Sequence, residues 1–204
     1  MGNIAAKLWE SEYVGYYGEE IFWKKGNWAP THWHRDSAYL PWAGEDWCNF
    51  WIPLGDMSAD YAVQVVRGSH KGILYDGTTF NPKDPTNPIC GEAADSPRLP
   101  DISADLEADP DAWDIVSFDV ALGDVVVLNP HCLHAGGPTD EDFPERRNLT
   151  LRFFDDKSYY SAHRLDVPGI FDHREQIASA AGGFLKDGDL YRPATLQANI
   201  QRRD

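Results

Sequence analysis

Two histidines and one aspartate have the residue types that bind a catalytic metal ion. His34 and Asp36 are separated by one residue, and His134 follows an apolar run and an Asn-Pro turn. Side chains at positions i and i+2 of a β-strand project from the same face. A strand over 34–40 would therefore aim His34 and Asp36 at one point. Two ligands hold a metal ion poorly, and we expect His134 to supply the third.

A set of two imidazoles and one carboxylate is typical of non-haem Fe(II) oxygenases, because it leaves coordination positions open for a co-substrate and O2. The same set can hold zinc. The spacing also leaves other histidines in competition: His32 shares the predicted strand face with His34, and His131 lies close to His134. Each of these histidines can instead be a structural residue.

A second group of polar residues lies on a predicted strand near residue 150. Alternation places four polar side chains on one strand face: Arg146, Asn148, Thr150 and Arg152. The planar guanidinium of Arg146 suits a carboxylate, and Thr150 would add a hydroxyl donor nearby. We expect Arg147 and Arg152 to face solvent. The apolar residues of the opposite face would pack under a helical layer.

The elements that must position these residues are mostly short strands. Gly, Pro and Asp turns separate them, which indicates an all-β barrel or sandwich. The expected strands cover 19–24, 34–40, 46–54, 61–67, 114–118, 124–128 and 148–154. Helices are expected at 4–11, with Asn3 as the N-cap, and at 173–183. Residues 76–112 are poor in large apolar residues and are predicted to be a long loop that serves as a lid.

Length, net charge and cysteine content limit the number of domains, the classes of binding partner and the expected location. The 204 residues suffice for one domain, 1–204, with a sizeable core. A net charge of −15 disfavours nucleic acid and membrane surfaces as partners. The three cysteines, Cys48, Cys90 and Cys132, lack CxxC spacing and suggest reduced thiols. With no signal-peptide pattern and no apolar run of membrane-spanning length, a cytoplasmic location is expected.

Five segments of the sequence resemble the phytanoyl-CoA dioxygenase family in order and spacing. They are THWHRD (31–36), CNFWIPL (48–54), VVRGSHKG (65–72), GDVVVLNPHCLHAGG (123–137) and ERRNLTLRF (145–153). The resemblance covers about residues 15–160. It implies an all-β core of the double-stranded β-helix type (a jelly roll, cupin-like) with a few flanking helices.

The resemblance also implies a cofactor and residue roles. Fe(II) would be bound with 2-oxoglutarate and O2 as co-substrates, and with ascorbate as a supporting reductant. Arg146 would hold the distal carboxylate of 2-oxoglutarate. Trp51 would lie beside this co-substrate, as would Ile21 or its neighbour Phe22. The iron ligands would be His34, Asp36 and His134. The implied reaction is hydroxylation of an unactivated C–H bond of a small molecule.

The sequence departs from the family pattern at three places. Members usually have a longer N-terminal part, so the chain is expected to be a short form or a truncation. Asp60-Tyr61 stands where the family often has Asn-Gly. Gly136, Pro138 and Thr139 stand where it often has a Ser or Asn partner after the distal histidine. Five aromatic residues are candidate pocket walls, with ordinary core packing as the alternative: Trp23, Trp28, Trp33, Tyr39 and Trp42.

Three other functions compete with hydroxylation. Halogenation is disfavoured because a halide must occupy the carboxylate's position, and Asp36 is present. A non-catalytic jelly-roll ligand-binding module would explain the strands and aromatic residues, although it gives Arg146 no role. A metal-dependent hydrolase with zinc at the same three ligands remains open.

Overall fold

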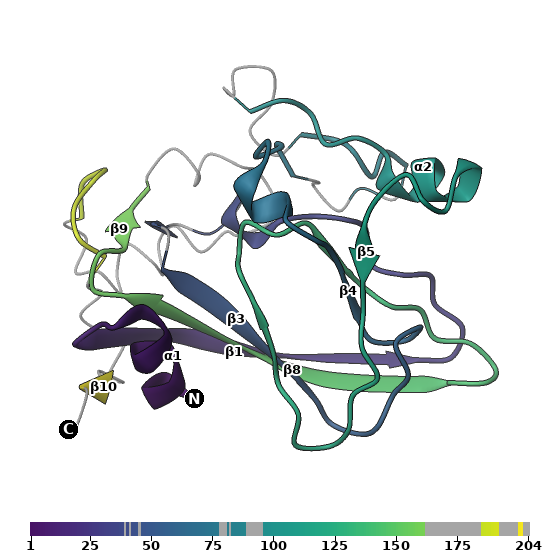
Figure 1. Cartoon of the computed structure of the whole chain (residues 1–204), viewed down its shortest axis with the longest axis horizontal. Helices are drawn as coiled ribbons and strands as arrows, with labels where there is room; N and C mark the ends of the chain where they lie inside the picture. The colour runs from purple at the N-terminus through teal and green to yellow at the C-terminus, as the bar shows by residue number, and fades with distance from the viewer. Residues whose placement is uncertain are drawn as a thin grey trace.

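The computed structural model describes residues 1–38, 40, 42–44, 46–77, 81, 83–88, 96–161, 185–191 and 200–201. This part of the chain is mostly antiparallel β-structure (Figure 1). Its two α-helices are α1 (Gly2–Trp9) and α2 (Ile102–Ala108).

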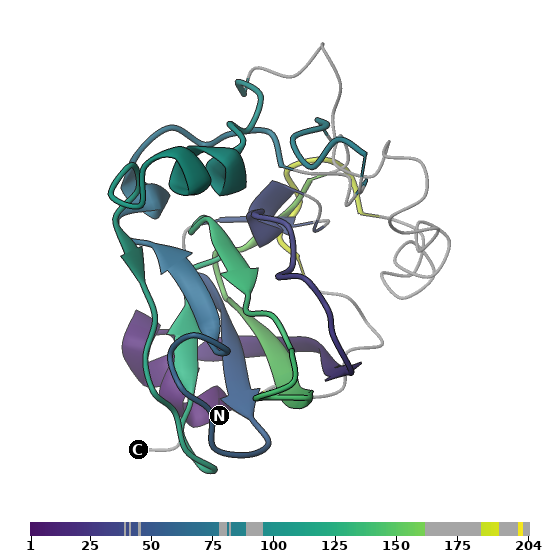
Figure 2. The same cartoon turned by 90° about the vertical axis from the view of Figure 1, so that its right-hand side faces the viewer.

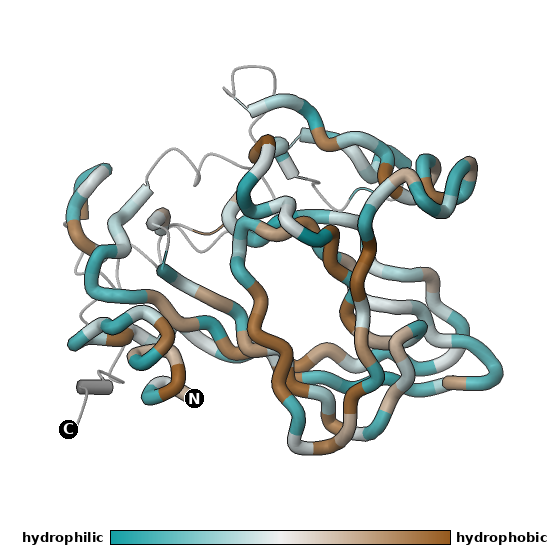
Figure 3. Tube along the Cα trace, in the orientation of Figure 1, coloured by the Kyte–Doolittle hydropathy of each residue, from teal (hydrophilic) through white to brown (hydrophobic). Residues whose placement is uncertain are grey.

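Two sheets face each other and form the jelly roll that the resemblance implies (Figure 2). The larger has the order β10 (Ile200–Gln201), β1 (Tyr13–Lys25), β8 (Glu145–Asp155), β3 (Trp47–Pro53) and β6 (Val126–Leu128). The smaller has the order β5 (Ile115–Val116), β4 (Val63–Val66) and β7 (His134–Gly136). A separate ribbon pairs β2 (Trp42–Ala43) with β9 (Tyr159–Tyr160). Hydrophobic stretches gather around β4 and β5, which lie over the larger sheet (Figure 3).

The central strand β8 has two chemically different faces, as alternation predicts. One face carries leucine and phenylalanine side chains, and its Phe153 packs edge-on against Phe50 of β3 with ring centroids 5.3 Å apart. Ala5 and Ala6 of α1 cover this pair, and their small side chains let the helix approach the sheet. The polar residues of β8 consequently face the space between the two sheets.

The predicted strand over 34–40 is wrong. His34 forms a single β-bridge to His134, and the chain then turns into a 3-10 helix, η1 (Asp36–Ala38). The turn is fixed from both sides: the Ser37 amide donates to the Pro130 carbonyl, and the buried Arg35 side chain donates to the Tyr75 carbonyl. Such long-range bonds are invisible to an argument from local alternation.

The predicted loop over 76–112 is not continuous, because it contains α2. The Asp101 side chain caps this helix by accepting the Ala104 amide at 3.1 Å. Leu99 and Ile102 are buried in a cluster that includes Trp33. The helix is too short and too poor in apolar residues to give a periodic signal. Closure of this segment as a lid remains a prediction.

The two predicted helices have different outcomes. α1 begins and ends two residues earlier than expected, with Met1 rather than Asn3 at its N-cap. Glu10 ends it in a left-handed conformation with φ of 53°. The helix predicted at 173–183 lies outside the described residues. No helix in the part of the chain that the structure describes is long and apolar enough to cross a membrane.

Removing the aromatic contact beneath α1 should destabilise the fold. Phe50→Ala deletes a side chain that is 1% exposed and leaves a cavity, so we expect the free energy of unfolding to fall by about 3–5 kcal/mol. Leu122→Ala is the control, because Leu122 is 70% exposed and its loss should change stability by less than about 0.5 kcal/mol. Urea denaturation measures both, and equal effects of the two changes would contradict this packing.

Candidate metal centre and adjoining cavity

The structure brings His34, Asp36 and His134 together between the two sheets. One potential ligand atom from each lies within 4.8 Å of the others, and all three residues are buried. The Nε2 atoms of the two histidines lie 3.5 Å and 3.8 Å from the same carboxylate oxygen, Oδ1 of Asp36. The rival histidines lie outside this group: His32 contributes only its backbone carbonyl, and the His131 ring contacts the Gly44 carbonyl.

Backbone pairing fixes the separation of the two histidines. The amide of each donates to the carbonyl of the other, at 3.1 Å and 2.9 Å. Nδ1 of His34 bonds to the His32 carbonyl at 2.7 Å, and Nδ1 of His134 bonds to the Cys132 carbonyl at 3.0 Å. A carbonyl can only accept, so Nδ1 carries the proton and Nε2 presents a lone pair to a metal ion.

Charge at the centre suits a divalent metal ion. Burial, followed by the neighbouring His34, lowers the pKa of His134 to about 4, so its imidazole is neutral at pH 7. Burial alone would raise the pKa of Asp36, but Arg152 and the two histidines hold it well below its usual range. Two histidine imidazoles and one carboxylate are the donor set that non-haem iron uses.

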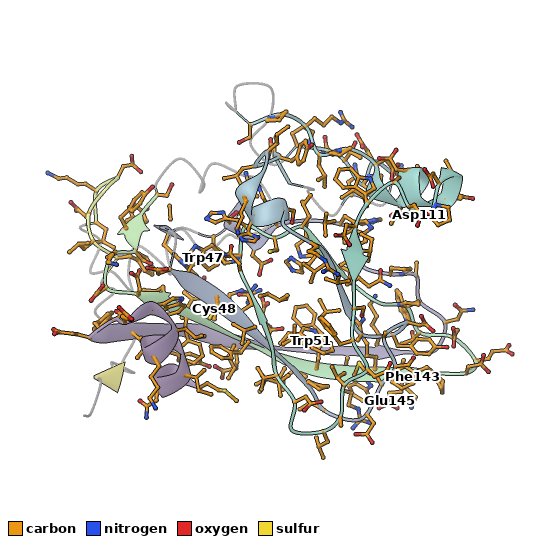
Figure 4. The ribbon with its side chains drawn as sticks, viewed as in Figure 1. Trp47, Cys48, Trp51, Asp111, Phe143 and Glu145 are labelled. Atoms are coloured by element: carbon orange, nitrogen blue, oxygen red, sulfur yellow. The ribbon has the colours of Figure 1, made fainter. Side chains whose placement is uncertain are left out.

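A cavity of about 230 Å³ adjoins the three residues. Its apolar walls come from Phe22, Trp51, Val63 and Leu128. Trp51 projects from β3 into the space between the sheets (Figure 4). The polar side of the cavity is the row on β8, from Arg146 to Arg152. Trp51 and Thr150 therefore both line this cavity, and their contact with a co-substrate stays a prediction.

Arg146 is a buried cation at this cavity. It is 3% exposed, its Nη1 donates to the carbonyls of Gly137 at 2.7 Å and Tyr61 at 3.3 Å, and its Nε has no partner. No carboxylate of the described residues pairs with it. Burial lowers the pKa of Arg146 to about 10, so it stays charged at neutral pH. A buried guanidinium with a free donor favours a bound carboxylate.

Gly136 makes room for this guanidinium. A Cβ atom at position 136 would lie 2.8 Å from Nη2 of Arg146 and 3.1 Å from the Thr31 hydroxyl oxygen. The space that a side chain at position 136 would occupy is therefore filled by the guanidinium and by a hydroxyl from Thr31. Burial and then the neighbouring Arg146 lower the pKa of Lys24 to about 8.

Several predicted positions do not reach the cavity. Ile21 is 69% exposed and alternates away from it, whereas its neighbour Phe22 is part of the wall. Trp33 and Trp42 belong to core clusters, which agrees with the alternative that they serve ordinary core packing. Trp23 and Trp28 are exposed, and Tyr39 lies outside the described residues.

Arg152 is the functional candidate that the sequence interpretation missed. It was expected at the surface but is 6% exposed, and it donates to Glu20 at 2.6 Å and lies 3.5 Å from Asp36. Its shared strand face with Arg146 was the available signal. Arg147 behaves as predicted: it is exposed, pairs with Glu145, and lies 5.1 Å over the Trp23 ring.

Removing the charge of Asp36 should abolish metal binding. We expect Asp36→Asn to weaken binding of Fe(II) more than about a hundredfold, because even residues that only support a ligand contribute about 10–100-fold. The control is Asp155→Asn, a buried aspartate that bonds to Ser158 at the end of β8. Anaerobic titration measures both. Unchanged affinity in Asp36→Asn would overturn the ligand assignment.

Comparison with known proteins gives one family and several structural relatives. The model of phytanoyl-CoA dioxygenase (PhyH) matches residues 5–147. A probable alpha-ketoglutarate-dependent hypophosphite dioxygenase of Stutzerimonas stutzeri is 26% identical over 136 residues, which cover 66% of this chain and 43% of that protein.

Two of the solved structures that match this chain illustrate the shared fold. The alpha-ketoglutarate-dependent carbocyclase SnoK from nogalamycin biosynthesis aligns with a TM-score of 0.59 and 21% identity, over 93% of this chain and 63% of its own. The epimerase SnoN, in complex with Fe3+, alpha-ketoglutarate and nogalamycin RO, aligns with a TM-score of 0.60 and 18% identity. The alignment covers 95% of this chain and 68% of the SnoN chain.

The chain spans less than half of the hypophosphite dioxygenase and less than two thirds of SnoK. The family model nevertheless matches most residues of this chain, and the match includes His34, Asp36, His134 and Arg146. The ordered segments, the jelly roll and this match agree: the chain belongs to the phytanoyl-CoA dioxygenase family.

Proposed function

We propose that the chain is an Fe(II)- and 2-oxoglutarate-dependent dioxygenase that hydroxylates a C–H bond of a small molecule. The observation that carries this proposal is one cavity that contains both a buried group of two histidines and an aspartate and a buried arginine without a carboxylate partner. Membership of the family supports it, and so do relatives named for alpha-ketoglutarate, which is another name for 2-oxoglutarate.

Each residue has a separate task in this function. His34, Asp36 and His134 hold the iron, which when bound activates O2 at the expense of 2-oxoglutarate oxidation to succinate and CO2. Arg146 binds the distal carboxylate of 2-oxoglutarate through its fork of donors. Thr150 and Thr31 line the same cavity and add hydroxyl groups, while Phe22 and Trp51 exclude water.

The competing functions explain less of the cavity. A ligand-binding module needs no buried metal group, and a zinc hydrolase gives no role to a buried arginine without a carboxylate partner. The presence of Asp36 favours hydroxylation over halogenation, because the carboxylate occupies the position that a halide needs.

The function is tested with wild-type chain loaded with Fe(II). We expect O2-dependent conversion of 2-oxoglutarate to succinate, stimulated by a true substrate in a screen of small molecules. Asp36→Asn should be inactive. Conversion that proceeds equally well with Zn(II), or a complete absence of iron-dependent turnover across the screen, would reject the proposal.

The two adjacent arginines provide a matched comparison of 2-oxoglutarate binding. Arg146→Ala removes a buried charged partner of the co-substrate, at a cost of about 3–5 kcal/mol. Affinity should therefore fall by two to three orders of magnitude, at about 1.4 kcal/mol per decade. Arg147→Ala removes an exposed charge worth less than about 1 kcal/mol. Calorimetry with Fe(II) under nitrogen measures both, and a larger loss in Arg147→Ala would contradict the assignment.

A further inference from the structure

The two oxygen atoms of the Asp36 carboxylate have different surroundings. Oδ1 faces the Nε2 atoms of His34 and His134, at 3.5 Å and 3.8 Å. Oδ2 accepts a hydrogen bond from the Asn49 side-chain amide and lies 3.5 Å from Nη2 of Arg152. One oxygen is therefore directed at the candidate metal position, and the other is directed at two nitrogen donors.

The strand framework fixes both donors. Asn49 of β3 and Arg152 of β8 are directly opposite each other in the antiparallel register, so their side chains lie side by side on the cavity face. Both residues are buried, and the second arm of Arg152, Nη1, donates to Glu20 of β1 at 2.6 Å. Three neighbouring strands thus contribute to holding one carboxylate oxygen.

We propose that Arg152 and Asn49 are positioning residues that retain Oδ2 of Asp36, so that the carboxylate binds a metal ion through Oδ1 alone. A carboxylate can bind a metal through one oxygen or both. Here the second oxygen could bind a metal ion only by competing with Asn49 and Arg152 for its lone pairs, which would weaken buried polar contacts.

The number of bonds that Asp36 makes to the metal ion determines how many positions remain for other ligands. The functional consequence of this number rests on the proposed function. Three protein atoms on one face of an iron ion leave the opposite face open for other ligands. A 2-oxo acid that chelates the iron would use two of these positions and would leave one for O2. A second bond from Asp36 would compete for that last position, so Arg152 and Asn49 keep it available.

The first experiment uses Fe(II) alone, without 2-oxoglutarate. Crystal structures of the iron-loaded wild type, Arg152→Met and Arg147→Met, prepared under nitrogen, would report the distance from each Asp36 oxygen to the metal. We expect binding through Oδ1 alone in the wild type and in Arg147→Met, which removes an exposed arginine from the same strand. In Arg152→Met both oxygens should bind. Single-oxygen binding in Arg152→Met, or two-oxygen binding in the wild type, would overturn the proposal.

A second variant keeps the inference testable if Arg152→Met does not fold. Asn49→Leu removes the other donor to Oδ2 without changing the charge. It should produce the same two-oxygen binding in the iron-loaded crystal. An Asp36 that still binds through Oδ1 alone in this variant would count against the proposal.

The second experiment separates positioning from general damage. Arg152→Met should retain the 2-oxoglutarate affinity of the wild type, while its O2-dependent consumption of 2-oxoglutarate falls about tenfold or more, equal to about 1.4 kcal/mol. A parallel loss of affinity and turnover would indicate a distorted cavity and reject the positioning role. If the wild type itself does not bind 2-oxoglutarate, the proposed function fails, and the iron-only structures still decide how Asp36 binds.

Discussion

The burial of the Asp36 carboxylate is the constraint on which the rest of this site depends. An ionised carboxylate moved out of water loses several kcal/mol of hydration, and it is stable only where cations and hydrogen-bond donors replace that water. At Asp36 those groups are Asn49 of β3, Arg152 of β8 and the bridged pair of His34 and His134. The loops and strands that meet there must therefore adopt one arrangement, since an unmatched charge would remain if any of them moved away.

Strand β8 joins the stability of the fold to the chemistry of the cavity. Its apolar residues lie under α1, and its polar residues face the smaller sheet. Because side chains alternate with a period of two, a shift of the register by one residue would exchange these faces. The long pairing with β1 on one side and with β3 on the other makes such a shift costly. Packing under α1 therefore keeps Arg146 and Arg152 directed into the cavity.

Alternation along 145–154 was sufficient to place Arg146 and Thr150 on one face, because that face depends only on neighbouring residues. The family resemblance supplied the jelly roll and the grouping of the three candidate ligands. The burial of Arg152 could not be deduced in the same way, since its partner Glu20 lies 132 residues away and comes close only through the β1–β8 pairing. The turn at Asp36 and the helix α2 likewise depend on contacts between distant segments. Of the two β1 residues that the resemblance implied, Phe22 lines the cavity and Ile21 is exposed.

The bridge between His34 and His134 makes the spacing of two imidazoles a property of the peptide backbone. The two rings lie with centroids 4.3 Å apart, and the amide of each histidine is paired with the carbonyl of the other. An incoming ion does not have to order two separate loops, so little conformational entropy is lost on binding. The same bond pattern means that this histidine pair comes apart only when the bridge itself opens. Local opening of the β7 segment would separate the two histidines, so release of a bound ion is expected to follow that opening.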